Sequence, residues 1–375
     1  MTEILADLFH HSTKDEIGKI CYLLQGRVAP LYEAIEFGMA DKMMIKVLAN
    51  AYNKSISEIT KLFKKEGDLG GVGQLLNIKR EAHIPAMMAD KQKFGVGEVY
   101  GILYKLALTM GMGSVDKKVS LLTLLLQNLD SLSVRYVVRI PLSKLRLGFS
   151  DMTILDALSV MLSKNKKDRK QIEAAYNVRP DMGFIAEQVK EKGLKGVQKI
   201  TPVVGIPILM TRAERLGSTE EIIEKIGKCG VEYKYDGFRL QVHYSKLKIL
   251  NSKYQTNNQN EKLFREEEPK EYVRLFSRNL EDVTNMYPDI VKGVFEQIKV
   301  RDAIFEGEAL AYNPKTKEFL PFQETVQRKR KYDIAQKAID IPLRLMVFEL
   351  LYVNGESLLK KPYLTRRRKL EEILA

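Results

Sequence analysis

The sequence predicts a multidomain protein, with an all-α domain over residues 1–200 followed by an α+β domain over residues 201–375. Three observations support this. Apolar residues recur at helical spacing through the first 200 residues, prolines and glycines break that spacing near residue 200, and strand-like alternation follows. At 375 residues, the chain is also longer than one hydrophobic core usually organises.

The first 200 residues predict one helix after another. Residues 17–24 and 121–125 both place Ile and Leu three and four positions apart. Ser55–Glu58 has the form of a capping box, with a serine three residues before a glutamate, and predicts the start of a helix. The glycine-rich runs at 67–73 and 111–114 predict loops between helices.

The pattern changes near residue 200. Pro202, Gly205 and Pro207 interrupt helical spacing and predict a linker, and Thr219–Ile226 predicts a short helix after it. Alternating or continuous apolar character then predicts strands. These expected strands are the second half of Val231–His243, Tyr272–Phe276, Ala303–Phe305 and Leu343–Phe348.

Composition limits the classes of function. The net charge is +13, and residues 101–150 hold seven basic and two acidic side chains. Such a surface attracts phosphate backbones, although charge alone equally fits a solvated basic protein. No apolar run approaches the ~20 residues of a membrane span, and no signal peptide is visible. Cys21 and Cys229 cannot form a four-cysteine zinc site and read as reduced cysteines of a cytosolic protein.

The segment Lys234-Tyr-Asp-Gly-Phe-Arg239 could carry chemistry. A lysine amine attacks phosphorus only when neutral, which requires burial or cationic neighbours, including a metal ion. Glycine permits a sharp turn beside phosphates, and Arg239 offers a fork of donors to hydroxyl, carboxylate or phosphate groups. Alone, the segment is equally a surface turn at a strand end.

Four later segments strengthen the interpretation. Arg278 follows an expected strand, and Glu306 and Glu308 stand two apart, on one face of another. Phe348 lies in an apolar strand that ends in Asn-Gly, and residues 321–330 form a cationic cluster. Each alone fits a simpler description, such as an exposed arginine, a strand-edge carboxylate pair, a core phenylalanine or a solvated basic helix.

In this order the segments resemble the covalent nucleotidyltransferase superfamily, and the longer strings resemble ATP-dependent DNA ligases of the archaeal and eukaryotic replicative type. The strings in the second half are Glu232–Arg239, Ser277–Arg278, Glu306–Glu308 and Phe348–Gly355. Those in the first half are Tyr22–Pro30, Ile35–Ala40, Gly113–Lys118 and Arg135–Gly148, which resemble the family's helical DNA-binding domain.

The resemblance implies that Lys234 is the catalytic nucleophile, which takes AMP from ATP with Mg²⁺ present. AMP would then pass to the 5′-phosphate of a nick in double-stranded DNA, and the 3′-hydroxyl would displace it. It also implies roles in DNA replication, repair and recombination, a cytoplasmic location, and an adenylation domain with antiparallel sheets.

The same resemblance assigns an ATP- and AMP-binding pocket. Glu232 would contact the adenine amino group through its strand, and Phe348 would stack on adenine. Arg239 would bind nucleotide and nick phosphate, while Arg278 and Glu308 would hold the ribose and phosphates. Glu308 is the one residue that we assign to the metal.

The helical half supplies the expected DNA contacts. Glycine and serine there can bring backbone N–H groups against phosphates, and basic side chains add charge. The assigned residues are Gly111, Gly113, Ser114, Lys117, Lys118 and Arg146.

The sequence departs from the family's pattern in three places. It stops before the later Glu-Gly motif, the Lys-containing motif and the OB-fold domain, so we expect an incomplete adenylation domain without an OB-fold. Such a fragment should bind nicked duplex, self-adenylate poorly and seal nothing. Asn251–Lys270 predicts a surface extension. Lys91–Phe94 stands where some relatives carry a sliding-clamp-binding loop but matches it poorly, and a plain surface loop is the simpler interpretation.

Two alternatives remain. A non-catalytic protein that binds nicked or intact duplex would form no AMP adduct at Lys234. Another lysine nucleotidyltransferase, such as an RNA ligase or a capping guanylyltransferase, would lack the helical domain and could prefer GTP. An NAD-dependent ligase is disfavoured by the missing zinc cysteines and by the late position of Lys234.

Overall fold

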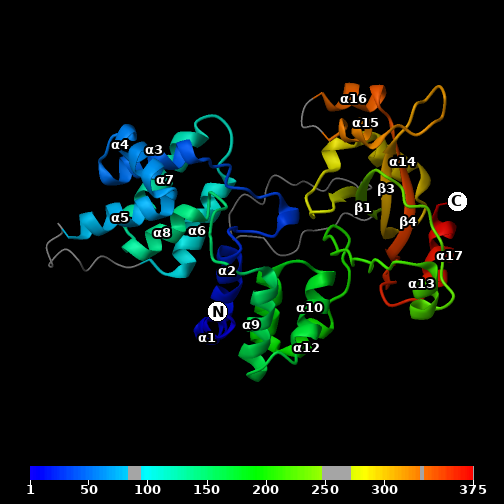
Figure 1. Ribbon diagram of the computed structural model, residues 1–375, viewed down its shortest axis with the longest axis horizontal. Helices are drawn as coiled ribbons and strands as arrows, with labels where there is room; N and C mark the ends of the chain where they lie inside the picture. The colour runs from blue at the N-terminus through cyan, green and yellow to red at the C-terminus, as the bar shows by residue number, and fades with distance from the viewer. Residues whose placement is uncertain (83–93, 247–271, 330–332, 375) are drawn as a thin grey trace. The chain divides into compact units, whose positions relative to one another are not determined.

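The computed structural model describes residues 1–82, 94–246, 272–329 and 333–374. The chain divides into two compact units. The first comprises Met1–Tyr176 and Asp181–Ile200, and the second comprises Asn177–Pro180 and Thr201–Ala375 (Figure 1).

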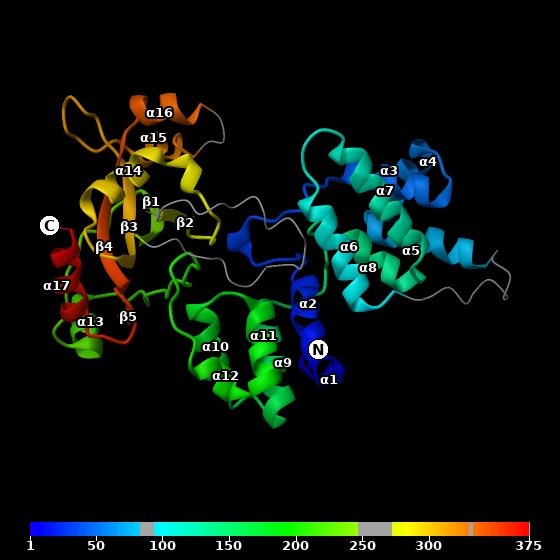
Figure 2. The same cartoon turned by 180° about the vertical axis from the view of Figure 1, so that it is seen from behind.

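The first unit is helical in the part that the structure describes, as predicted. Helices α3 to α8 share one apolar core, while α1 packs on α9 and α2 on α11. Both views show α9 to α12 gathered beside α1 and α2 (Figures 1 and 2). The helices are α1 (Thr2–His11), α2 (Lys14–Leu24), η1 (Leu31–Glu33), α3 (Asp41–Tyr52), α4 (Ile56–Glu66), α5 (Leu69–Glu81), α6 (Val96–Leu108), α7 (Ser114–Gln127), α8 (Ser131–Arg139), α9 (Asp151–Ser163), α10 (Arg169–Val178), α11 (Met182–Lys192) and α12 (Leu194–Gln198).

The ends of α4 show one prediction confirmed and one wrong. The Ser55 hydroxyl accepts the Glu58 N–H at 3.2 Å, which closes the capping box. The expected loop at 67–73 is instead the last cap of α4 followed by the first turns of α5. Its glycines allow close helix packing, because a Cβ at Gly70 would lie 2.5 Å from the Arg135 carbonyl oxygen on α8.

The second unit contains a five-stranded antiparallel sheet in the order β2-β1-β3-β4-β5. The predicted strands and the short helix α13 are confirmed. The strands are β1 (Phe238–Ser245), β2 (Tyr272–Ser277), β3 (Asp302–Ala311), β4 (Leu343–Val353) and β5 (Glu356–Ser357). The helices are α13 (Thr219–Ile226), η4 (Thr284–Met286), α14 (Pro288–Gln297), α15 (Phe322–Val326), α16 (Ile334–Asp340) and α17 (Tyr363–Ile373).

The two faces of β1 have different roles. Leu240, Val242 and Tyr244 point into the main core of the unit, which α14 and α17 cover. Because side chains alternate along a strand, Arg239, Gln241 and His243 occupy the opposite face. On that face lies the segment 203–210, here named the strap, whose Val204 and Ile208 pack on Ile304.

Some predictions fall outside the described residues. These are the extension at 251–270 and the first three residues of the Lys91–Phe94 segment. Among the residues that are described, no helix is long and apolar enough to cross a membrane.

Candidate functional site

The polar face of β1 meets β3 at an ion pair. Strand register sets Gln241 opposite Glu306 and Arg239 opposite Glu308. The Arg239 guanidinium donates to the Glu306 carboxylate, whose side chain is only 5% exposed, against 28% for Arg239. The guanidinium also lies 5.2 Å from the centre of the Phe348 ring on β4. Three strands therefore bring an arginine, a carboxylate and an aromatic ring together.

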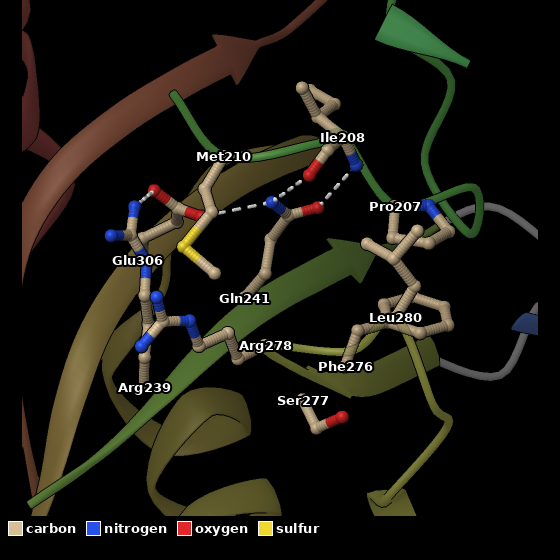
Figure 3. A pocket seen from close by; sticks show the side chains of 10 residues that line it. All are labelled: Pro207, Ile208, Met210, Arg239, Gln241, Phe276, Ser277, Arg278, Leu280 and Glu306. Carbon is tan, nitrogen blue, oxygen red and sulfur yellow. Dashed lines mark hydrogen bonds and ion pairs between the residues drawn. The ribbon is translucent and has the colours of Figure 1, made fainter. Parts of the chain in front are cut away.

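A shallow pocket, open to solvent, lies beside this ion pair. Figure 3 shows Arg278, from the turn after β2, reaching across it toward Arg239. Within the described chain, the buried Nε of Arg239 has no hydrogen-bond partner. The pocket thus presents two guanidinium groups to an anionic or hydroxyl-rich ligand. Its lining residues are Pro207, Ile208, Met210, Arg239, Gln241, Phe276, Ser277, Arg278, Leu280 and Glu306.

Glu308 lies beside the segment that carries Lys234. Its half-buried carboxylate accepts the Gly237 N–H, and burial raises its pKa, opposed by that hydrogen bond and by the positive charges of Lys234 and Arg239. Gly237 has no room for a side chain, because a Cβ would lie 2.2 Å from the Ala309 carbonyl oxygen. The glycine of the predicted motif thus lets the chain pass directly over β3 and brings Lys234 within electrostatic reach of Glu308.

Lys234 itself is exposed and precedes β1. Burial is therefore not the means by which its amine could become neutral. The charges that act on Glu308 include those of Lys234, Arg239 and Asp236. Glu308, Asp236 and Arg239 thus lie near the segment that carries Lys234, and the cationic neighbour that the amine requires would be Arg239 or a bound metal ion.

Glu232 differs from its expected setting. It lies before β1 rather than in a strand, so the strand setting expected for it is wrong, while its contact with adenine stays a prediction. Its carboxylate instead accepts the hydroxyl of Tyr363 on α17 at 2.7 Å, and Arg367 lies 3.8 Å away. The Tyr363 ring packs on Gly230, where a Cβ would come within 2.7 Å of it. Helix α17 therefore holds the segment that leads into Lys234.

Phe348 owes its position to a β-bulge. Its neighbours Val347 and Glu349 pair with Gly307 and Glu306, so Phe348 falls at the register shift. Arg366 on α17 holds Glu349 through two hydrogen bonds of 2.8 and 2.9 Å. The bulge and this clamp leave the half-buried Phe348 ring against Arg239.

Two further residues of this face were not assigned from sequence. Gln241 donates to Glu306 at 3.0 Å, and His243 contacts Gln241 at 2.9 Å. The signal that could have found them is the alternation Arg239-x-Gln241-x-His243, which sets three polar side chains on one face of a strand.

The residues assigned to DNA in the first unit cluster around two loops. Gly111 and Gly113 adopt positive φ of 85° and 76°, and Ser114 begins α7. Arg146 is exposed and donates to the Gly67 carbonyl at 3.3 Å. These backbone conformations require glycine at 111 and 113 and leave the start of α7 with no side-chain cap.

Lys117 and Lys118 differ in exposure. Lys117 is exposed, whereas Lys118 is 7% exposed and donates to the Phe37 carbonyl at 2.5 Å. Burial lowers the pKa of Lys118. The amine of Lys118 thus serves the fold of the first unit, while its contact with DNA stays a prediction.

A metal ion has a limited set of donors here. No group of three or more His, Cys, Asp and Glu side chains occurs among the described residues. Glu308, with the nearby charge of Asp236, fits Mg²⁺, which commonly takes one or two carboxylates and completes its shell with water and substrate phosphates.

Comparisons with known proteins agree with one another. Residues 1–159 match the family model described as DNA ligase N terminus, and residues 263–375 match the ATP dependent DNA ligase domain. The chain is 44% identical over 375 residues to a probable DNA ligase of Dictyoglomus turgidum, covering all of this chain and 59% of the relative. It is 40% identical to DNA ligase 2 of Thermofilum pendens, again covering all of this chain and 59% of the relative.

The relatives also cover what the family models leave out. Neither model match includes residues 160–262, where Lys234 lies, but both relatives align across the whole chain. The chain spans less than two thirds of the length of these relatives.

Proposed function

The chain belongs to the ATP-dependent DNA ligase family, and from this premise we propose that Lys234 takes AMP from ATP to begin the sealing of nicks in duplex DNA. The Lys234 amine attacks the α-phosphorus, a P–N bond forms, and pyrophosphate leaves. The 5′-phosphate of the nick then takes AMP from the lysine. Finally the 3′-hydroxyl attacks that phosphate, and AMP leaves as the strand is joined.

One observation carries the proposal. Glu308 is half-buried and lies within electrostatic reach of Lys234, Arg239 and Asp236. Arg239 in turn pairs with Glu306 and lies over Phe348. This cluster combines an amine nucleophile, a carboxylate and a guanidinium, groups that transfer of a nucleotidyl group to lysine uses; of the three, Arg239 lines the pocket.

We assign the pocket residues accordingly. Arg239 and Arg278 bind phosphate and ribose oxygens, because their guanidinium groups reach the same pocket. Phe348 stacks on adenine. Glu308 and Asp236 would hold Mg²⁺, which when bound to ATP neutralises charge that develops on the phosphates. Glu308 also fixes the Gly237 backbone and thereby the approach of Lys234.

For the helical unit we propose binding to the backbone of nicked double-stranded DNA. Gly111, Gly113 and Ser114 offer backbone N–H groups at the start of α7, while Lys117 and Arg146 add exposed charge. Such contacts read duplex shape rather than base sequence, which suits an enzyme that must act at any nick.

The wider setting follows from this chemistry. Nick sealing serves DNA replication, repair and recombination, and the cytoplasm is where we place the protein. A sliding clamp is a candidate partner only through Lys91–Phe94, of which Phe94 alone lies among the described residues.

Mass spectrometry after incubation with ATP and Mg²⁺ tests the proposal. We expect one AMP adduct, mapped to Lys234, which is absent in Lys234→Ala and retained in Lys228→Ala, a matched exposed lysine of the same segment. GTP in place of ATP should give no adduct. An adduct that persists in Lys234→Ala would contradict the proposal. Binding to nicked duplex without any adduct would favour the non-catalytic alternative.

A further inference from the structure

A continuous line of hydrogen bonds joins the strap to the pocket. It starts at the Gly205 N–H, which donates to His243 Nδ1 at 2.9 Å. His243 Nε2 lies 2.9 Å from the Oε1 of Gln241. Both side chains are buried, His243 at 0% exposure and Gln241 at 5%. Neither group can exchange its protein partners for water without opening the strap.

Gln241 uses the full capacity of its amide. Its Oε1 accepts the Ile208 N–H at 2.7 Å as well as the His243 ring, and its Nε2 donates to the Ile208 carbonyl and to Glu306 Oε1, both at 3.0 Å. The oxygen of a side-chain amide only accepts, so the hydrogen of His243 must be on Nε2. Nδ1 is then bare and accepts from Gly205. This arrangement fixes both the amide orientation and the histidine tautomer.

The line of hydrogen bonds ends at Glu306 and Arg239, which line the pocket. Glu306, 4% exposed, receives Gln241 on Oε1 and the Arg239 guanidinium on Oε2. The strap meanwhile forms the opposite wall through Pro207, Ile208 and Met210 (Figure 3). Gln241 is thus the group that bonds directly both to a wall of the pocket and to the carboxylate that holds Arg239.

Attachment of the strap alone does not explain this line. Val204 and Ile208 already pack on Ile304, and apolar side chains at 241 and 306 would extend that contact without burying a carboxylate. Burying a line of polar groups costs desolvation free energy, and such lines are retained where they fix the position of a particular side chain. In this unit that side chain is Arg239.

We propose that Gln241 is a positioning residue, which holds Glu306 and through it Arg239 at a set distance from the strap, with His243 locking the Gln241 amide. The inference rests on the proposed function in so far as Arg239 binds the nucleotide. It adds two residues, at 241 and 243, that act on the reaction without touching the substrate.

The first test measures lysyl-AMP formation by the full chain over a range of ATP concentrations. Gln241→Met preserves the side-chain volume but removes both amide donors, so Glu306 and Arg239 lose their fixed geometry. We expect kcat/KM for ATP, here the second-order rate constant of single-turnover adenylation, to fall about 10- to 100-fold. The loss should lie mainly in KM, since Lys234 and Glu308 are untouched.

Thr325→Val is the matched control. Thr325 is fully buried in the same unit, and its hydroxyl accepts the Ala311 N–H at 3.2 Å and donates to Pro321. Both variants lose buried polar contacts. If Gln241 had only a structural role, the rate of adenylation would fall in each variant only in proportion to its unfolded fraction. Equal kcat/KM in Gln241→Met and wild type, or an equal fall in Thr325→Val at equal melting temperature, would overturn the inference.

A second measurement does not depend on adenylation. Side-chain ¹⁵N spectra of arginine, with the Arg239 signal assigned by Arg239→Lys, report how freely its guanidinium rotates. We expect slow rotation in wild type and fast rotation in Gln241→Met. If wild type forms no AMP adduct, the proposed function fails, and this spectrum still decides the positioning role. Equally slow rotation in the variant refutes it.

Discussion

His243 predicts that the second unit loses stability in mild acid. An unfolded histidine has a pKa of about 6.5. In the folded chain, burial and, to a smaller extent, the positive charge of Arg274 together lower the pKa of His243 to about 3. Its tautomer is also committed, because Nδ1 must stay bare to accept the Gly205 N–H. Protonation of Nδ1 would therefore place its new N–H directly against the Gly205 N–H.

The sign and size follow from linkage. A group whose folded pKa is depressed contributes stability above its unfolded pKa and loses it as the pH falls toward the folded value. For His243 the loss runs from about pH 6.5 toward pH 3. Between pH 7.5 and pH 5 it amounts to about 2 kcal/mol in the free energy of unfolding. That is a large part of the 5–15 kcal/mol typical of a domain.

Hydrogen exchange of the β1 amides from Leu240 to Tyr244 provides the assay. It reports the opening of the second unit alone, which matters because a two-unit chain need not unfold in one step. Glutamine does not titrate in this range. Between pH 7.5 and pH 5, the free energy of unfolding should therefore fall by about 2 kcal/mol less in His243→Gln than in wild type, after correction for intrinsic exchange rates. The same pH dependence in both proteins would refute the reasoning, since carboxylates titrate equally in each.

Four further predictions concern single positions. Burial raises the pKa of Glu308, so the ionised carboxylate destabilises the second unit increasingly as the pH rises. Glu308→Gln should therefore raise the melting temperature at neutral pH, which calorimetry would measure. The same variant should form no AMP adduct, which mass spectrometry would show. Gly70→Ala should destabilise the first unit by about 1–3 kcal/mol, because its Cβ meets the Arg135 carbonyl, and thermal unfolding would show it. Lys117→Ala should reduce the salt dependence of duplex binding by about one unit of slope. Lys118→Met should leave that slope unchanged and cost about 1 kcal/mol of stability instead.

Local signals in the sequence were sufficient where neighbours along the chain decide the structure. The capping box at Ser55 is complete within four residues, and its bonds form as expected. Alternation of apolar and polar residues likewise located β1, and strand-like apolar segments located β2, β3 and β4. The order of motifs along the chain indicated the family, which the comparisons then showed.

Features that depend on distant partners could not be read from the sequence. Lys118 stands in a basic stretch typical of a surface, yet its partner is the Phe37 carbonyl, 81 residues earlier. Glu232 lies outside the expected strand, and its carboxylate accepts the hydroxyl of Tyr363, 131 residues later. The glycines at 70 and 73 resemble loop residues until α8 is placed against them, where they become sites of close packing.

The polar face of β1 shows the same limit for functional residues. Alternation alone could assign Leu240, Val242 and Tyr244 to the core, since apolar residues on one face suffice for burial. The residues on the opposite face are equally buried at 241 and 243, so burial does not separate structural from functional side chains here. What separates them is where their hydrogen bonds lead. The bonds of Gln241 and His243 begin at the strap and end at Arg239, a guanidinium that faces an open pocket and keeps one buried donor unpaired among the described residues. A line of buried polar groups that ends on a guanidinium facing an open pocket is consistent with the positioning role proposed for Gln241, because its bonds orient a group that solvent and a ligand can reach.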